Sequence, residues 1–169
     1  MATGPVERWA TDLCRVWGGQ DGWLTLALVI DCHTRELLGW HLSRSGKAST
    51  AGAALEQALI ARFGSLGKVS NAFLLRSDNG LVFTSRDYTR LVRSYGLKQE
   101  FITPHCPQQN GMVERDIRTL KEPCVHHHRF ESQQNAMRII EDRINFYNNR
   151  KPHHALGMKT PAQAYQLAA

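Results

Sequence analysis

The sequence lacks most of the features that mark secreted, membrane-bound or disulfide-stabilised proteins. Only four of its 169 residues are cysteines, and they lie far apart without a Cys-x-x-Cys pair. No apolar run approaches the roughly 20 residues that cross a bilayer, and residues 1–9 have no apolar core of the kind found in signal peptides. We therefore expect a cytoplasmic protein with reduced thiols and no membrane partner.

Internal repeats, low-complexity tracts and long linkers are also absent. A chain of 169 residues, 42% hydrophobic and 21% charged, has the size and composition of one globular domain. We expect a core over about residues 5–150 and a C-terminal arm over residues 151–169. The arm contains Pro152 and Pro161, and we expect it to pack without regular structure.

An acidic surface is the third absence. The formal net charge is +6, with 21 Lys and Arg residues against 15 Asp and Glu residues. An excess of basic side chains favours polyanionic partners, because binding to phosphates releases condensed counterions. Many soluble domains are mildly basic, so charge alone indicates a nucleic-acid partner without establishing one.

Hydrophobic periodicity divides the chain into strands and helices. The first third is strand-like and interrupted by turns, and helical spacing of apolar residues begins at Lys47. The predicted strands cover residues 9–17, 23–30, 36–43, 72–76 and 97–102. The predicted helices cover residues 47–63, about 88–95, 111–127 and 132–148, the last with Met137, Ile140, Ile144 and Tyr147 on its apolar face.

This order, βββαβαβ followed by helices, predicts an α/β fold with a mixed five-stranded sheet. Short turns between the first three strands indicate an antiparallel meander, and the later strand–helix–strand units predict helices on both faces. Right-handed crossovers would place the fourth strand beside the first. Asp12 on the first strand and Asp78 at the carboxyl end of the fourth would then lie together, although 66 positions separate them.

Three acidic residues are the candidate catalytic and metal-binding groups. Asp12 lies in the middle of a predicted strand, where aspartate is disfavoured and a charge needs a partner or a metal. Asp78 follows a buried strand, and Glu114 lies in the first turn of a predicted helix. Taken singly, Asp78 also suits an Asn-Gly turn and Glu114 suits a helix dipole. Asp12 is therefore the first of the three residues that a functional role explains better than a structural role.

Convergence of three carboxylates predicts a divalent cation. The like charges repel one another, and a hard cation such as Mg²⁺ or Mn²⁺, which prefers oxygen ligands, relieves the repulsion. Two such ions, roughly 3.5–4 Å apart, can activate the attacking oxygen and stabilise the leaving oxygen of a phosphodiester. We therefore expect Asp12, Asp78 and Glu114 to hold Mg²⁺ or Mn²⁺, with two ions in a DNA complex.

The helix that carries Glu114 also carries a basic stripe. Arg118 and Lys121 follow Glu114 by four and seven residues, so all three lie on one helix face. The acid at one end of this helix face suits a metal ligand, and the two basic residues beyond it suit contacts with phosphates. The alternative is a solvated face with a Glu–Arg pair one turn apart.

Several segments, taken together, resemble one known family. Thirty-five residues separate Asp78 from Glu114, as in the Asp-Asp-Glu signature of retroviral integrases and insertion-sequence transposases. The segments RWATD, VIDCHTRELLGW, LRSDNGLVFTS, PHCPQQNGMVERDIRTLKE and INFYNNRKPHHALGMKTPAQAY resemble the integrase-core region of OrfB-type transposases of the IS-three family. The resemblance covers nearly the whole chain, with several motifs in the family's order and spacing.

The resemblance implies a ribonuclease-H-like integrase core that cuts and joins DNA. Asp12, Asp78 and Glu114 match the family's three metal-binding acids, and Lys121 matches a basic residue that contacts donor DNA. The implied chemistry is strand cleavage by water, followed by attack of the freed 3′-hydroxyl on another phosphodiester. No covalent enzyme intermediate is implied.

The resemblance also implies element ends and target DNA as partners. Asn110 and Gly111 match the mobile loop before the catalytic helix, and with Arg118 and Lys121 they form the expected DNA-binding set. Family members usually carry a helix-turn-helix segment before the core, for which this chain has no room. We therefore do not expect this region alone to recognise element ends. The apolar character of the final helix suits a homodimer or higher oligomer, since transposases act on two DNA ends.

Competing chemistries have weaker sequence support. His126–His128 lie near Cys124, but successive helix residues point about 100° apart, and the spacings of structural zinc sites are absent. His105 and Cys106 are neighbours in sequence, which does not provide the geometry of a nucleophile and its base. We therefore favour a polar helix end over a zinc site and do not expect a Cys–His nucleophile.

Other acids and aromatic residues have simpler structural roles. Asp31 ends the second strand, where it either lines the site edge or, more simply, forms a turn. Asp116 lies two residues after Glu114 and points to another side of the helix. Core or interface packing is expected for the four tryptophans of the strands, Trp9, Trp17, Trp23 and Trp40.

Two other functions fit the same residues. One is a non-catalytic DNA-binding or assembly remnant of a transposase, because basic charge explains DNA binding without chemistry. The other is a ribonuclease-H-type nuclease acting on RNA–DNA hybrids, which would share the fold and the metals. Divalent-dependent cleavage distinguishes the first alternative, and comparison of hybrid with duplex DNA substrates distinguishes the second.

Overall fold

The structure is a computed structural model that describes residues 4–102, 115, 118, 119, 122 and 129–168. Its strands are β1 (Arg8–Trp17), β2 (Trp23–Asp31), β3 (Leu37–Ser43), β4 (Leu74–Ser77) and β5 (Lys98–Phe101). Its helices are α1 (Ala48–Phe63), α2 (Arg86–Ser94), α4 (Gln133–Asn149) and α5 (Pro161–Ala168), with 3-10 turns η1 (Gly19–Asp21) and η4 (His154–Leu156). The predicted order βββαβαβ is confirmed. Most of the predicted helix over residues 111–127 lies outside the described residues.

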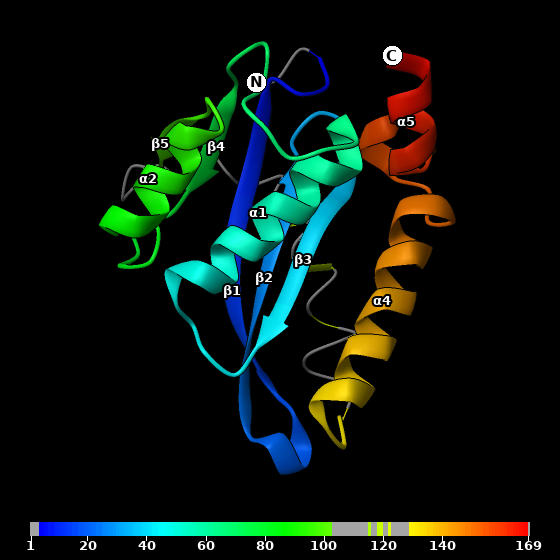
Figure 1. Cartoon of the computed structure of the whole chain (residues 1–169). Helices are drawn as coiled ribbons and strands as arrows, with labels where there is room; N and C mark the ends of the chain where they lie inside the picture. Colours follow the sequence, from blue (N-terminus) through cyan, green and yellow to red (C-terminus); the bar gives the residue numbers. More distant parts are fainter. Residues whose placement is uncertain (1–3, 103–114, 116–117, 120–121, 123–128, 169) are drawn as a thin grey trace.

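The five strands form one mixed sheet in the order β3-β2-β1-β4-β5 (Figure 1). β1 pairs antiparallel with β2, and β2 antiparallel with β3, so the first three strands form the predicted meander. β4 pairs parallel with β1, and β5 parallel with β4. The prediction that the fourth strand lies beside the first is therefore confirmed.

Helices cover both faces of the sheet, as predicted. Because side chains alternate along a strand, the apolar run of β2 serves two hydrophobic clusters. Leu26 and Leu28 belong to the cluster covered by α4, which we call the α4-side cluster. Ala27 and Val29 belong to the cluster covered by α1 and α2, which we call the α1-side cluster. The sheet is thus the middle layer of three.

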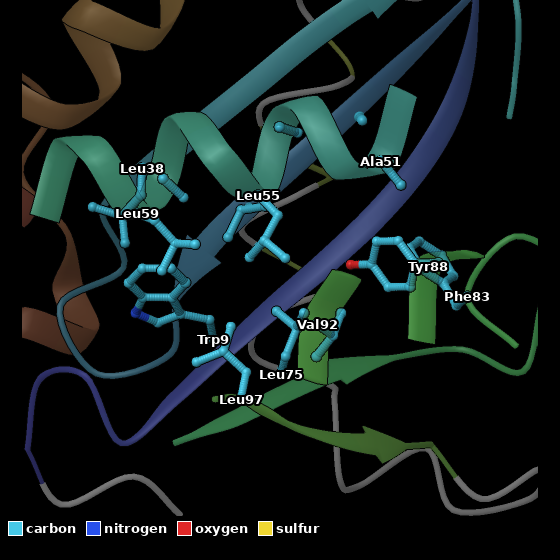
Figure 2. Close-up of a cluster of buried hydrophobic side chains, with 14 of the residues drawn as sticks. Trp9, Leu38, Ala51, Leu55, Leu59, Leu75, Phe83, Tyr88, Val92 and Leu97 are labelled. Atoms are coloured by element: carbon cyan, nitrogen blue, oxygen red, sulfur yellow. The ribbon is translucent and has the colours of Figure 1, made fainter. Parts of the chain in front are cut away.

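The α1-side cluster is built around Trp9 of β1, whose side chain is fully buried. The ring centroids of Trp9 and Phe73 lie 4.6 Å apart, in the range of favourable aromatic pairs. Figure 2 shows Leu55 and Leu59 extending from α1 toward the sheet, where Trp9 and Leu75 lie. Full burial of each large apolar side chain contributes roughly 1.5–3 kcal/mol, so this cluster fixes α1 over the sheet.

The apolar face of α4 is confirmed except at its first residue. Ile140, Ile144 and Tyr147 are buried, as predicted. Met137 is 42% exposed, so its predicted place in the core is wrong. Ala136 occupies that place instead, and Met137 lies about 100° further round the helix.

The end of α4 is fixed to the edge strand β3. The Asn148 side chain accepts a hydrogen bond from the Leu37 backbone N–H and donates one to the Leu37 carbonyl oxygen, both at 2.9 Å. The amide group therefore satisfies backbone groups at the start of β3, in the manner of a neighbouring strand. Such a two-point contact sets the position of α4 along the sheet.

The C-terminal tail is more regular than the sequence led us to expect. We predicted an irregular arm over residues 151–169, whereas residues 161–168 form α5. Thr160 and Gln163 form a reciprocal capping box: the Gln163 N–H donates to Thr160 Oγ1, and the Thr160 N–H donates to Gln163 Oε1. Pro161 takes the first helical position, where its missing N–H costs nothing. Pro161 starts this helix instead of preventing it.

A buried arginine anchors α5 to the sheet layer. The Arg62 side chain at the end of α1 is 4% exposed, with its Nη1 3.1 Å from Glu36 Oε2 and its Nη2 3.5 Å from Asp31 Oδ2. The guanidinium carbon lies 3.5 Å from the centroid of the Tyr165 ring of α5. In this cation–π contact, the Tyr165 ring shields the guanidinium charge of Arg62 from solvent.

The four strand tryptophans differ in environment. Trp9 is buried as predicted, and Trp40 is partly buried against the α4-side cluster. Trp17 and Trp23 are 53% and 54% exposed and form an edge-to-face pair at the end of the β1–β2 hairpin. Figure 1 shows this hairpin extending past the rest of the sheet. Core packing is therefore confirmed for Trp9, whereas Trp17 and Trp23 lie outside the core and only the interface alternative of the prediction remains for them.

Among the helices of the described residues, none combines the length and apolarity needed to span a lipid bilayer.

Close approach of α1 to β3 depends on Gly39. A Cβ atom built at this position would lie 2.1 Å from the Ala54 carbonyl oxygen and 2.7 Å from the Ala58 backbone nitrogen. Both obstacles are helix backbone, so no side-chain rotation can relieve them. Any side chain here would push α1 away from the sheet and open the α1-side cluster.

We predict that Gly39→Ala lowers the free energy of unfolding by about 1–3 kcal/mol, the usual cost of overpacking a core. Gly67→Ala is the matched control, because a Cβ there meets no atom within 4 Å and Gly67 has no left-handed backbone conformation. Urea unfolding of both variants measures the difference. Equal stability of the two variants would contradict the close contact between α1 and β3.

Candidate active site

Asp12 lies in the middle of β1, on the face that α4 covers. Ala10, Cys14 and Val16, which share its alternation along the strand, all belong to or pack against the α4-side cluster. Asp12 itself is only partly exposed, and its Oδ1 accepts a hydrogen bond from the Leu13 N–H at 2.9 Å. A carboxylate is thus presented from a rigid central strand at the border between core and solvent.

Asp78 follows the last residue of β4 and is exposed. Its Oδ1 accepts a hydrogen bond from the Gly80 N–H at 2.7 Å, which orients the carboxylate within the turn. A Cβ at Gly80 would approach the same oxygen to 2.7 Å, so glycine is needed for this contact. The Asn79 side chain donates to the Ile102 carbonyl oxygen at 3.4 Å, just beyond β5.

The far end of the turn that follows Asp78 packs against the α1-side cluster. Phe83 is buried and packs edge-to-face with Tyr88, with ring centroids 5.4 Å apart. The Gln99 side chain donates to the Phe83 carbonyl oxygen at 2.8 Å, and Ser85 Oγ accepts from the Tyr88 N–H as the N-cap of α2. Contacts from β5, α2 and the core therefore define the path of the turn that carries Asp78.

The register of β1 with β4 relates the two aspartates. The pairs are Arg8 with Leu74, Trp9 with Leu75 and Ala10 with Arg76. Continued by two residues along both strands, the same offset sets Asp12 opposite Asp78. Neighbouring strands lie about 4.8 Å apart and paired residues point to the same face. The offset therefore relates Asp12 to Asp78, the residue that directly follows the carboxyl end of β4.

The remaining predicted site residues are mostly outside the described part of the chain. Glu114, Lys121, Asn110 and Gly111 lie outside it, and their predicted roles stay predictions. Arg118 is described, and it is helical and exposed. Within the described residues, no group of three His, Cys, Asp or Glu side chains is arranged to hold a metal ion. Of the three predicted ligands, Asp12 and Asp78 lie within the described residues, and their role as ligands stays a prediction.

A charge cluster that the sequence did not indicate lies beside Asp78 and joins three strands. Arg76 of β4 donates to Glu100 Oε1 on β5 from its Nε at 3.1 Å and from its terminal nitrogen at 2.6 Å. Arg8 of β1 donates from its Nε to Glu100 Oε2 at 3.0 Å. Charged residues inside predicted strands were the available signal. Their pairing could not be predicted because it depends on the register of β1, β4 and β5.

The arginines determine the protonation of Glu100. Partial burial acts to raise the pKa of this carboxyl, but the hydrogen bonds and positive charge of Arg76, together with Arg8, outweigh burial and hold the pKa below its ordinary value of 4.5. Arg76 precedes Asp78 by two residues on the same strand face. The cluster thus fixes the strand segment that leads into the site.

Other candidate chemical groups have structural roles. Asp31 is fully buried, and its carboxylate accepts hydrogen bonds from the backbone N–H groups of Val6, His33 and Thr34. The simpler expectation for Asp31, a turn-forming residue, is therefore confirmed. Burial raises the pKa of the Cys32 thiol to about 11, so this thiol stays neutral and is a poor nucleophile or metal ligand. Cys106, Cys124, His105 and His126–His128 lie outside the described residues.

Protein-family models match most of the chain. Two family models, both described as "Integrase core domain", match residues 2–107 and residues 95–161. Together the two matches cover the chain from β1 through α4. The first match alone includes Asp12 and Asp78.

The curated relatives come from insertion elements. "Transposase InsF for insertion sequence IS3A" of Escherichia coli (strain K12) is 30% identical over 163 residues, covering 96% of this chain and 54% of that protein. An uncharacterized protein of insertion element IS136 from Agrobacterium fabrum is 31% identical over 162 residues, covering 92% of this chain and 80% of that protein. The chain therefore spans about half the length of the InsF relative.

Solved structures with the same fold are retroviral integrase cores. The catalytic core domain of BIV integrase has a TM-score of 0.67 at 20% identity, covering 96% of this chain and 95% of that chain. The HTLV-2 integrase catalytic core domain in complex with magnesium, in its dimeric form, has a TM-score of 0.68 at 18% identity, covering 98% of this chain and 99% of that chain. The predicted ribonuclease-H-like fold is confirmed.

The fold and the family match define the class of protein as an integrase core. The chain belongs to the integrase core domain family, and the curated relatives described above come from insertion elements. The resemblance inferred from the motifs is thereby confirmed.

We predict that Glu100→Gln lowers the free energy of unfolding at neutral pH by about 1–3 kcal/mol, because two arginines lose their charged partner. The folded-state pKa of Glu100 lies below the unfolded one, so the carboxylate stabilises the fold above the unfolded pKa and this contribution disappears as the pH falls through the folded pKa. The gap between wild type and Glu100→Gln should therefore be full above the ordinary pKa of 4.5 and shrink as the pH falls below it.

Urea unfolding across this pH range measures the gap. Glu141→Gln is the control, since Glu141 is exposed on α4. A gap that stays constant down to the acid end would contradict the role of the Glu100 charge.

Proposed function

We propose that this chain is the catalytic domain of a DNA transposase that cleaves and joins DNA strands with the help of divalent cations. The observation that carries the proposal is the register of β1 with β4, whose offset relates Asp12 to Asp78. The family match and the transposase relative support the same reaction class. Active sites of open α/β sheets also gather at the carboxyl ends of strands, where Asp78 lies.

The donor set fits Mg²⁺ or Mn²⁺. Both aspartates offer only hard oxygen ligands, and both are reached by solvent. Gly80 orients one oxygen of Asp78. An integrase core of the same fold, from HTLV-2, is described in complex with magnesium. We assign Asp12 and Asp78 as cation ligands, with Glu114 as the third and with two ions in the DNA complex.

Divalent cations bound there would activate the attacking water or 3′-hydroxyl and stabilise the leaving oxygen of the phosphodiester. The contribution of the chain itself is to hold the carboxylates in place before DNA arrives. β1 presents Asp12 from the centre of the sheet, and the Gly80 N–H holds the Asp78 carboxylate in its turn. Groups fixed in advance need no reorganisation during the reaction, which is a main source of catalytic power.

DNA contacts complete the proposal. Arg118 is exposed on a helical segment, and Lys121, Asn110 and Gly111 are assigned with it to bind donor or target DNA. A homodimer or higher oligomer would bring two DNA ends together. The HTLV-2 integrase core is described in dimeric and trimeric forms, which supports self-association in this fold.

We predict that Asp12→Asn and Asp78→Asn each lower metal-dependent DNA strand cleavage and strand transfer by about a hundredfold or more, because each removes a charged cation ligand. Nicking of supercoiled plasmid DNA in Mn²⁺ measures cleavage, and joining of duplex oligonucleotides measures strand transfer. The matched control is Asp87→Asn, which changes an exposed carboxylate in the first turn of α2. Asp87→Asn should keep wild-type activity.

Thermal unfolding of all three variants tests whether the fold is intact. Wild-type activity in Asp78→Asn would overturn the assignment. Absence of divalent-dependent cleavage by the wild type on pre-cut element ends would instead indicate a DNA-binding remnant. Preference for RNA–DNA hybrids over duplex DNA would indicate a ribonuclease-H-type nuclease.

A further inference from the structure

The charge cluster of Arg8, Arg76 and Glu100 is on the same side of the sheet as Asp12. Arg76 is paired with Ala10 across β4 and β1, and paired residues point to the same face. Ala10 belongs to the α4-side cluster. Asp12 follows Ala10 by two residues along β1, so the alternation of side chains returns it to the same face. Arg76 and Asp12 are therefore neighbours on adjacent strands.

Arg76 is close enough to Asp12 for the two side chains to meet. Adjacent strands are about 4.8 Å apart and each residue advances about 3.3 Å, so the diagonal between the two Cα atoms is about 8 Å. Long side chains reach diagonal neighbours at such a spacing. Asp78 follows Arg76 by two residues, immediately after β4. The guanidinium of Arg76 is thus within reach of a proposed cation ligand.

Glu100 directs the Arg76 guanidinium the other way, toward β5. Two nitrogens of Arg76 donate to Glu100 Oε1, the Nε at 3.1 Å and the Nη2 at 2.6 Å. In the sheet, β4 separates β5 from β1, so these bonds draw the guanidinium away from the strand that carries Asp12. The ion pairs between described residues include Arg76 with Glu100 and do not include Arg76 with Asp12.

Arg8 fixes the other oxygen of the Glu100 carboxylate. Its Nε donates to Glu100 Oε2 at 3.0 Å, so each carboxylate oxygen accepts from a different arginine. Arg8 precedes Asp12 by four residues, which is roughly 13 Å along β1. Arg8 is therefore too distant to pair with Asp12 itself, and its contribution is to orient Glu100.

An arginine released from Glu100 would compete with a divalent cation for Asp12. A carboxylate that accepts hydrogen bonds from a guanidinium uses the oxygens and the negative charge that a cation also needs. The Arg76 side chain is only 10% exposed, so water would compensate its charge poorly and a new carboxylate partner would be favoured. Glu100 supplies a carboxylate to Arg76 and so removes the competitor from Asp12.

We propose that Glu100 is a positioning residue that keeps Arg76 away from Asp12 and Asp78 and thereby keeps these carboxylates available to Mg²⁺ or Mn²⁺. The inference rests on the proposed function, because it takes the two aspartates as cation ligands. In this role Glu100 contacts neither the cation nor DNA and acts only through Arg76. Loss of Glu100 therefore weakens cation binding only while Arg76 is present.

The test is a double-mutant cycle on Mn²⁺ binding by the full chain. The variants are Glu100→Ala, Arg76→Gln and Glu100→Ala/Arg76→Gln, and electron paramagnetic resonance measures the Mn²⁺ that stays free in solution. Arg8→Gln is the matched control, because it removes one positive charge from the same cluster and leaves Arg76 bonded to Glu100. The measurement needs no DNA and no catalysis, so it is independent of enzyme activity.

We expect Glu100→Ala to raise the Mn²⁺ dissociation constant about tenfold, a typical coupling between charged residues in contact. In the Arg76→Gln background the same substitution should change it by less than about twofold, because the competitor is absent. Arg8→Gln should also change it by less than about twofold, since Arg8 is more than a Debye length from Asp12. An equal effect of Glu100→Ala in both backgrounds would overturn the inference, because Glu100 would then act through its own charge.

Failure of the inference and failure of the proposed function give different results. Mn²⁺ binding that is lost in Asp12→Asn, with equal effects of Glu100→Ala in both backgrounds, overturns the positioning role alone. Mn²⁺ binding that is unchanged in Asp12→Asn, or absent from the wild type, overturns the proposed site and the positioning role with it. Thermal unfolding checks each variant. If Glu100→Ala does not fold, Glu100→Gln replaces it, and we expect a smaller shift that again requires Arg76.

Discussion

The parallel pairing of β1 with β4 is the constraint on which the geometry of the site depends. Asp12 and Asp78 are far apart in sequence, and the offset between the paired strands relates them to each other. A shift of the register by one residue would turn one carboxylate to the opposite face, because side chains alternate along a strand. The fold therefore has to specify this register strongly. Trp9 and Leu75 are paired across the two strands, and their full burial in the α1-side cluster favours this register. Arg8, Arg76 and Glu100 favour it through charge across three strands.

Charge is distributed unevenly over this scaffold. Asp12 and Asp78, the proposed cation ligands, are acidic residues in a chain with a positive excess, whose exposed arginines include those of α2 and Arg118. Like charges that met at the proposed site would cost free energy unless a cation were present. Such a combination would suit a phosphodiester substrate, because basic side chains bind phosphates and carboxylates bind divalent cations. The ion pairs of Arg62 with buried Asp31 and partly buried Glu36 are separate from these residues, and Arg62 also contacts Tyr165 of α5.

Much of the fold could be predicted from local patterns. The near-continuous apolar run of β2 predicted a strand covered on both faces, and the spacing of Tyr88, Val92 and Tyr95 predicted α2. The site could be predicted in part, because an aspartate in the middle of a strand is conspicuous. Other features depended on geometry that sequence spacing does not contain. The bonds of Glu100 to two arginines need the final register, and the exposure of Trp17 and Trp23 follows from a hairpin that extends beyond the sheet. The helix α5 could have been predicted from local sequence. Thr160 and Gln163 form its capping box, and Pro161 takes its first position, but the prolines of the tail indicated an irregular arm instead.

We propose that Asp12 and Asp78 share one cation. An anomalous-scattering map of crystals of the chain bound to duplex DNA and soaked in Mn²⁺ tests this. We expect a peak bonded to a carboxylate oxygen of each aspartate at about 2.1 Å, the distance of an oxygen-ligated divalent cation of this size. Ordered Asp12 and Asp78 side chains directed into separate regions, with no peak between them, would show that they do not share a cation.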